Sequence, residues 1–180
     1  MAIITQRSRV ETAINFVKGA PGMYLAIGRG NPWEDEKNPP AENANATKLD
    51  EVIGYKKVSR ISNCRLLKSG EKPIYPTVVW EKATYVLVPE NKAQEEKADK
   101  VYMEFVIKDK DLPLGPYRQI GLHTNLKPKS GMSQKEALVP SDVSDTGTLF
   151  LYENREAYNR VEDVVFTEAL VVTFTEPKIV

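Results

Sequence analysis

The stretch Val101-Tyr102-Met103-Glu104-Phe105-Val106-Ile107-Lys108 alternates between a purely apolar set of side chains and a more polar set. Because alternate side chains of a β-strand point to opposite faces of a sheet, this pattern predicts a strand with one better-buried face. Other runs rich in β-favouring residues occur at 23–27, 52–67, 73–80, 83–88, 117–126, 147–152 and 164–174. The sequence therefore predicts a mainly β fold with a sandwich-like antiparallel core.

One segment has helical instead of strand periodicity. Within residues 5–18, apolar side chains recur at helical spacing, at Val10, Ala13, Ile14 and Val17. Gly19 and the Pro21-Gly22 pair follow, and both features are typical of the end of a helix. This predicts one N-terminal helix, so the expected fold class is α+β.

Long polar segments separate the expected strands. Residues 28–48 combine two clusters of Gly or Pro with several Asn and many charges, and residues 127–144 form a second loop with Pro and Gly. Loops of this length without regular structure are usually functional or disordered. Residues 153–160 are polar and predict a turn between the last two strands.

The composition is that of an ordinary globular protein. The chain has 180 residues, and its 25 Lys and Arg balance its 25 Asp and Glu, so the formal net charge is zero. This length suits a single domain, residues 1–180. A nucleic-acid-binding protein usually has a basic surplus, so we expect no nucleic-acid partner. No apolar run approaches the roughly 20 residues of a membrane helix, so we expect no membrane insertion and no signal peptide.

The sequence offers few groups for catalysis or for cofactor binding. With one histidine, His123, and one cysteine, Cys64, the chain cannot supply the four N or S ligands of a usual structural zinc site. Both residues lie within expected strands, which predicts structural roles for them. Residues 28–33 begin like a dinucleotide-binding turn, but Pro32 and Trp33 break that pattern. We therefore expect no catalytic or metal-binding residue, no cofactor and no enzymatic activity.

The loop at 28–48 holds the candidate contact residues. A large aromatic side chain in a polar loop often anchors a protein–protein contact, and Trp33 is such a residue. The alternative is that Trp33 folds back and caps its own core, and the sequence leaves both open. The predicted interface comprises Arg29, Trp33, Pro39 and Pro40.

Three segments, taken in order, resemble a known family. The first is the opening helix with the turn Gly28-Arg29-Gly30-Asn31-Pro32-Trp33 and then Asn38-Pro39-Pro40. The second is Tyr117-Arg118-Gln119-Ile120 with Thr124-Asn125, and the third runs from Thr146 to Arg155, with a closing strand at 168–174. Together they are similar to the baseplate wedge protein encoded by gene eight in T4-like contractile-tailed bacteriophages. That family has a large insertion, so residues 43–111 would be its shortened counterpart.

The resemblance implies a structural subunit of a contractile-tail baseplate wedge, located in the virion and made in the bacterial host cytoplasm. It also implies a homodimer that binds other wedge proteins, without catalysis. The sequence leaves two other functions open. A tail-tip module that recognises a carbohydrate or receptor would need an exposed aromatic platform, drawn from Trp33, Trp80 or tyrosines, and a small hydrolase would need two carboxyl groups in a cleft.

Overall fold

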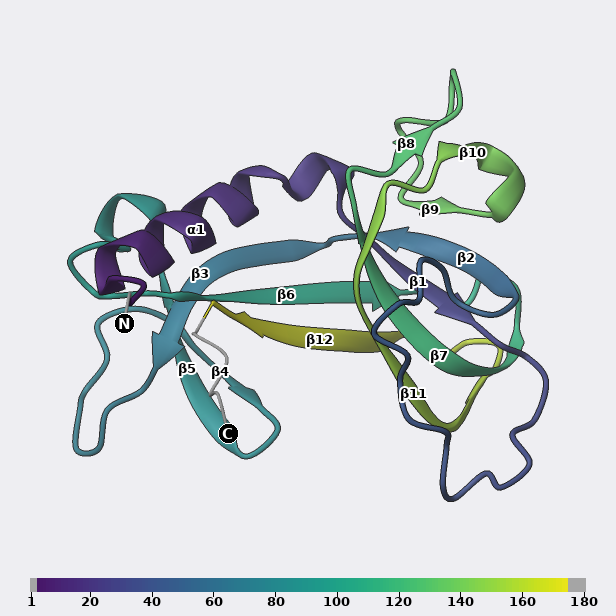
Figure 1. The fold of residues 1–180 in the computed structure, drawn as a ribbon, viewed down its shortest axis with the longest axis horizontal. Coiled ribbons are helices and arrows are strands. Elements are labelled where there is room, and N and C mark those ends of the chain that lie inside the picture. The colour runs from purple at the N-terminus through teal and green to yellow at the C-terminus, as the bar shows by residue number, and fades with distance from the viewer. Residues whose placement is uncertain (1–2, 175–180) are drawn as a thin grey trace. The chain divides into compact units, whose positions relative to one another are not determined.

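The computed structural model describes residues 3–174, in which one α-helix and twelve strands form two compact units (Figure 1). Of the described residues, 3–20, 59–104 and 169–174 form unit 1, and 21–58 and 105–168 form unit 2. The elements are α1 (Gln6–Lys18), β1 (Tyr24–Gly28), β2 (Val52–Lys57), β3 (Arg60–Leu66), β4 (Thr77–Trp80), β5 (Ala83–Val88), β6 (Lys100–Ile107), β7 (Gly115–Thr124), β8 (Lys127–Pro128), β9 (Ala137–Leu138), β10 (Val143–Asp145), β11 (Thr148–Arg160) and β12 (Phe166–Thr173), with 3₁₀ turns at Ala20–Gly22, Glu90–Lys92 and Pro140–Asp142.

Unit 1 is built on helix α1 and the sheet ordered β12-β6-β3-β5-β4, whose strands β6 and β12 continue into unit 2. The Thr5 hydroxyl caps the helix by accepting the N–H of Ser8 at 3.3 Å, and the helix ends before Gly19. Val10 and Ala13 are fully buried on its inner face, and Val10 packs in one cluster with Val86 of β5. The predicted N-terminal helix is therefore confirmed.

The opposite face of the unit 1 sheet has its own apolar cluster, formed by Cys64, Tyr85, Leu87 and Tyr102. Burial raises the pKa of the Cys64 thiol to about 12, so this cysteine is a protonated, unreactive part of the core. The Trp80 indole N–H donates to the Ala169 carbonyl at 2.9 Å, which fixes that side chain on its own unit.

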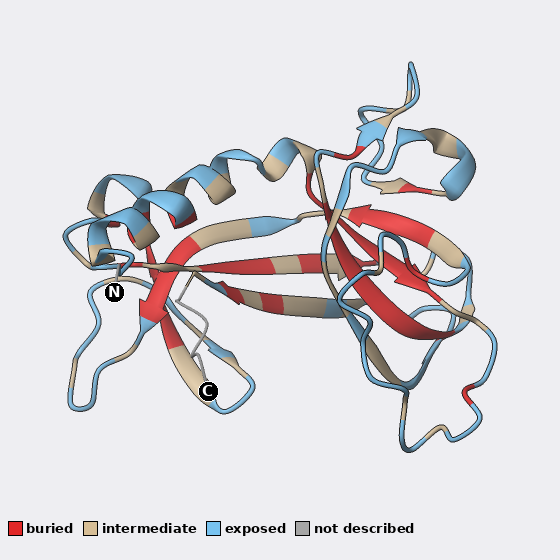
Figure 2. Cartoon of the chain, viewed as in Figure 1, coloured by how far each residue is buried: buried red, intermediate tan, exposed pale blue. Residues whose placement is uncertain are grey.

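Unit 2 is built on the curled sheet ordered β11-β7-β1-β2-β9, with a small β10-β8 pair beside it (Figure 1). Strand β1 is buried along its whole length, and Tyr24 of β1 faces His123 of antiparallel β7 (Figure 2). A strand that is buried on both faces reads as a continuous apolar run, as residues 23–27 do. The core cluster of this unit comprises Tyr24, Ala26, Leu49, Tyr55, Leu126 and Leu138.

The fold class expected from the sequence, mainly β with an N-terminal helix, is confirmed. The strand predicted at residues 101–108 is β6. Its apolar side chains, those of Val101, Met103, Phe105 and Ile107, are fully buried, as the alternation predicts. Residues 52–67 form two strands, β2 and β3, that belong to different sheets.

The turn predicted at residues 153–160 was wrong, because these residues continue β11. β11 is an edge strand that pairs with β7, and its register shifts between Asn154 and Tyr158. Its later residues are largely exposed, so they can be polar without leaving the strand.

Candidate assembly surface

The loop between β1 and β2 begins and ends at the same place. The Arg29 N–H donates to the Asp50 carbonyl at 2.8 Å and to the Glu51 carbonyl at 3.2 Å, and its Nη1 donates to Asp50 Oδ2 at 3.1 Å. A Cβ at Gly28 would lie 2.8 Å from the Asp50 carbonyl oxygen, so only glycine allows this approach. The segment is therefore an Ω-like loop that is closed at its base.

Trp33 lies inside this loop and packs on its own unit. Its side chain is 8% exposed, and its indole N–H donates to the Arg155 carbonyl of β11 at 2.9 Å. The Arg29 guanidinium carbon lies 3.8 Å from the centre of the Trp33 ring, which is a close cation–π contact. Of the two arrangements left open by the sequence, the chain has the one in which Trp33 covers its own core.

Two buried polar side chains of β7 hold the two ends of the loop. Arg118 is 7% exposed, and its Nε donates to Glu36 Oε1 at 2.7 Å while its Nη1 donates to the Gly30 carbonyl. The Gln119 Oε1 accepts the N–H of Asp50 at 2.8 Å. Both ends of the loop are thus fixed to the same strand, with the buried Arg118 charge compensated by Glu36.

Strand β11 holds the second half of the loop. The Asn154 Nδ2 donates to the Pro40 carbonyl at 2.8 Å, and its Oδ1 accepts from Gln119 Nε2 at 2.8 Å. The Tyr152 hydroxyl contacts the backbone of Asn43. Together with Trp33 and Arg118, these contacts give a long irregular loop a single fixed conformation.

The three segments that carry the family resemblance meet at this loop. Arg118, Gln119, Asn154 and Arg155 lie in those segments, but sequence reasoning assigned them no role. The available signal was the polar pair Arg118-Gln119 inside an otherwise apolar run, because buried polar side chains need partners.

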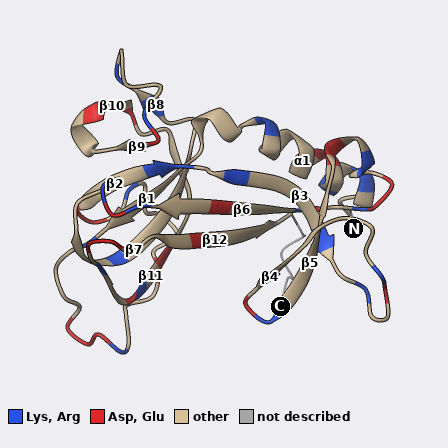
Figure 3. Cartoon of the chain, turned by 180° about the vertical axis from the view of Figure 1, so that it is seen from behind, with Lys and Arg blue, Asp and Glu red and all other residues tan. Residues whose placement is uncertain are grey.

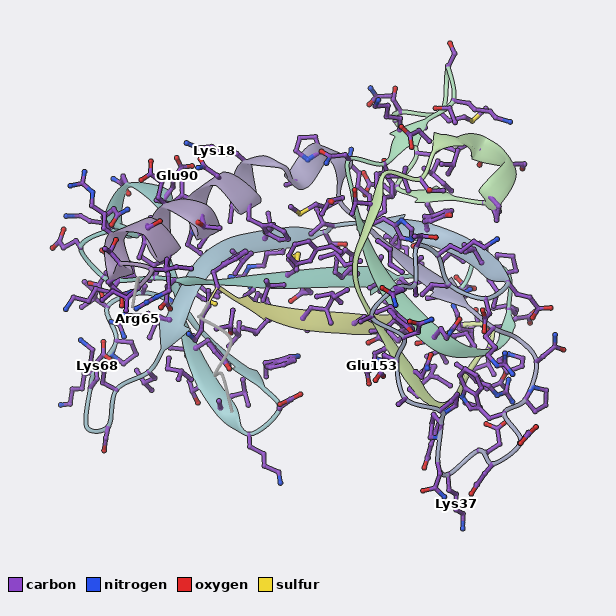
Figure 4. All side chains as sticks on the ribbon, viewed as in Figure 1. Lys18, Lys37, Arg65, Lys68, Glu90 and Glu153 are labelled. Atoms are coloured by element: carbon purple, nitrogen blue, oxygen red, sulfur yellow. The ribbon has the colours of Figure 1, made fainter. Side chains whose placement is uncertain are left out.

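The solvent-facing side of the loop, here called the loop surface, comprises the exposed residues Glu34, Asp35, Lys37, Asn38 and Pro40. A pocket of about 490 Å³ lies beside it, lined by Arg29, Trp33, Glu34, Asp35, Asn38, Pro40 and Asp50. Lys37 projects from the loop (Figure 4), and Pro39 is half-buried. Of the predicted interface residues, Arg29, Trp33 and Pro40 therefore line one pocket, and whether a partner binds there stays a prediction.

His123 is a buried residue of β7, as its place in a predicted strand indicated. It is 1% exposed, its Nδ1 lies 2.9 Å from the Thr146 carbonyl oxygen, and its ring packs edge-on against Tyr55. The carbonyl can only accept, so Nδ1 carries the proton in this contact. Burial lowers the pKa of His123 from its ordinary value of 6.5, which keeps the imidazole neutral.

His123 should make the stability of the chain depend on pH. In the unfolded chain the imidazole gains a proton as the pH falls through about 6.5, whereas the folded chain resists protonation until its lower pKa is reached. The stabilisation is therefore complete above about pH 6.5 and decreases below it. We expect His123→Gln, measured by thermal unfolding from pH 8 to pH 5, to lose stability at neutral pH and to show a smaller decrease in acid. Equal pH dependence in both proteins would contradict this role.

Within residues 3–174, no group of three or more His, Cys, Asp or Glu side chains could hold a metal ion. None of the helices in that range is long and apolar enough to cross a membrane. Lys/Arg and Asp/Glu are interspersed over both units (Figure 3).

Comparison with known proteins identifies the class to which this fold and loop belong. Residues 1–174 match the family described as "Baseplate wedge 3 tail fiber network component", and the chain belongs to that family of phage baseplate proteins. It is 42% identical over 178 residues to "Virion protein 3" of Enterococcus phage phiEF24C, covering 99% of this chain and 98% of that protein. The predicted relationship to a phage baseplate wedge family is confirmed, and the protein is a component of the virion, located in the tail baseplate.

Proposed function

We propose that this chain is a structural subunit of the baseplate wedge of a contractile tail, which acts by binding copies of itself and neighbouring wedge proteins and has no catalytic role. The observation that carries the proposal is the family match over residues 1–174. The fixed loop supports it, because a long loop held in one conformation loses little entropy when it docks against a partner.

The proposed contact with neighbouring wedge proteins is the loop surface together with its pocket. Arg29, Trp33 and Pro40 line this pocket. Pro39 and Pro40 stiffen the segment and cannot donate backbone hydrogen bonds, so the segment binds through side chains and carbonyl groups. In this proposal Trp33 supports the surface and the exposed residues around it make the contact.

We further propose that residues 1–180 act as one baseplate-wedge-like domain, in which residues 43–111 correspond to a reduced insertion. The two compact units support this, because each is assembled from separate segments of the chain and neither is continuous in sequence. Because the chain passes back and forth between the units, neither unit is a single continuous segment that could be separated as an independent domain.

Disruption of the gene in the phage tests the structural role. We expect infected cells to accumulate tails without complete baseplates in negative-stain electron micrographs, and we expect wild-type protein supplied in trans to restore them. Lys82→Gln offers a complementation control, because Lys82 is exposed in the β4–β5 turn and is no part of the loop surface or of its pocket. Normal baseplates in particles that lack this protein would overturn the proposal.

A further inference from the structure

A second pocket, of about 630 Å³, lies on unit 2 at a place that the loop surface does not use. It is formed by the connection between β6 and β7 and by the turn between β11 and β12. Its lining includes Asp109, Leu112, Pro113, Leu114, Glu162 and Asp163. We call it the hairpin pocket.

Exposed large apolar side chains lie in the two connections that form the hairpin pocket. Leu114 is 45% exposed, Val161 is 47% exposed, and Val165 is 59% exposed. Gly115 pairs with Arg160 at the end of the β7–β11 ladder, so Leu114 and Val161 leave the two strands next to each other. Exposed apolar side chains that gather beside a pocket are typical of a surface that binds another protein.

The charge of the hairpin pocket indicates what kind of segment fits there. Within residues 3–174, the carboxylates of Asp109, Glu162 and Asp163 form no ion pair, whereas the neighbouring Asp111 is neutralised by Lys56 at 3.0 Å. Lys110 is the basic residue in the lining, and the buried Arg160 guanidinium binds the carbonyls of the same β6–β7 connection, so two positive charges stand against three unpaired carboxylates and a negative excess remains. An occupant should therefore combine an apolar side chain with a positive charge.

The β3–β4 loop of unit 1, residues 67–76, has this combination. Ile74 is 81% exposed between Pro73 and Pro76. Lys68, labelled in Figure 4, and Lys72 are both exposed and form no ion pair with any of residues 3–174. An isoleucine so far into solvent in a Pro-stiffened loop has no packing role in its own chain.

The base of this loop is held firmly. Arg65, at the end of β3, donates to Glu71 Oε1 at 2.6 Å and to Glu96 Oε2 at 2.6 Å. These contacts neutralise Glu71 within the loop and leave Lys68 and Lys72 as its uncompensated charges. A loop that is already ordered loses less entropy when it docks.

We propose that the loop at residues 67–76 of one copy docks in the hairpin pocket of a second copy. Ile74 then packs against Leu114 and the exposed valines, and Lys72 faces Glu162 and Asp163. This inference rests on the self-association proposed above and names its contact. Each copy carries both the loop and the pocket, so the same contact can repeat between copies.

A charge swap tests the contact in the full-length chain. We expect Lys72→Glu and Asp163→Lys each to weaken self-association at least about tenfold in sedimentation equilibrium, because each places like charges in the contact. The double variant should recover most of the lost affinity, since the pair is restored with its sign reversed. Lys82→Glu is the matched control, because Lys82 is an exposed lysine in the β4–β5 turn, and it should leave the affinity unchanged.

Unchanged affinity in both single variants would overturn the contact, as would a double variant no better than the singles. A wild-type chain that stays monomeric up to about 100 μM would also overturn it. A monomeric wild-type chain would also contradict the proposed self-association, whereas changes confined to the variants would overturn this contact alone. The structural role in the baseplate is tested independently by gene disruption. Unfolding temperatures equal to wild type confirm that the exposed charge changes leave the fold intact.

Discussion

Trp33→Ala should lower the melting temperature of the chain and release the β1–β2 loop from its unit. The change removes a ring that is 8% exposed, its hydrogen bond to the Arg155 carbonyl and its contact with the Arg29 guanidinium. Truncation of a buried aromatic side chain typically costs about 3 kcal/mol or more, which corresponds to roughly 6–12 °C in a chain of this size. Thermal unfolding followed by circular dichroism measures this shift, and faster hydrogen exchange at residues 29–50 would report the released loop.

Two companion variants separate support of the loop from contact with a partner. Trp33→Phe keeps a ring beneath Arg29 and loses the indole N–H, so it should cost only about 1 kcal/mol. Pro40→Glu alters the loop surface at an exposed position and should leave the melting temperature near that of wild type while impairing baseplate assembly. If Trp33→Ala keeps full stability and loses assembly, Trp33 itself contacts the partner and does not merely support the loop.

The strand at residues 101–107 could be predicted because its two faces differ in polarity. One buried apolar face holds the side chains of Val101, Met103, Phe105 and Ile107, so apolar and more polar residues alternate in this part of the sequence. Residues 153–160 lack that signal, because the end of β11 is an exposed edge whose position is set by pairing with β7. Edge strands are held by backbone hydrogen bonds, which any side chain permits.

The conformation of the β1–β2 loop could not be predicted for a related reason. The partner of the Trp33 indole is a backbone carbonyl more than a hundred residues later, and every residue has such a carbonyl. Arg118 and Gln119 can be recognised in the sequence as polar residues within an apolar strand. Their partners, Glu36 and Asp50, cannot be identified from the sequence. The sequence predicts a contact surface in this loop, which stays a prediction, and the long-range contacts decide which of its residues reach solvent.

Arg160→Leu should be among the most destabilising single changes in unit 2. Arg160 is 4% exposed, and its guanidinium donates to the carbonyls of Pro113 at 2.6 Å and Lys108 at 2.7 Å, with further bonds to Leu112 and Asp109. These carbonyls belong to the connection between β6 and β7, so one side chain orders that whole segment. Without the guanidinium, several of them would lose their partner, and each unsatisfied buried group costs about 1–3 kcal/mol.

The total expected loss for Arg160→Leu is about 3–5 kcal/mol, measured as a decrease in the free energy of unfolding in urea. Arg160→Lys is the matched control for charge. An ammonium group has three donors on one nitrogen and cannot reach four carbonyls spread along a segment, so the lysine variant should recover only a minor part of the loss. If Arg160→Lys is as stable as wild type, positive charge at this position is sufficient and the fork of hydrogen bonds is not what orders the segment.

Because the same segment lines the hairpin pocket, Arg160→Leu should also weaken self-association. Unchanged association would show that the pocket does not depend on the order that Arg160 provides.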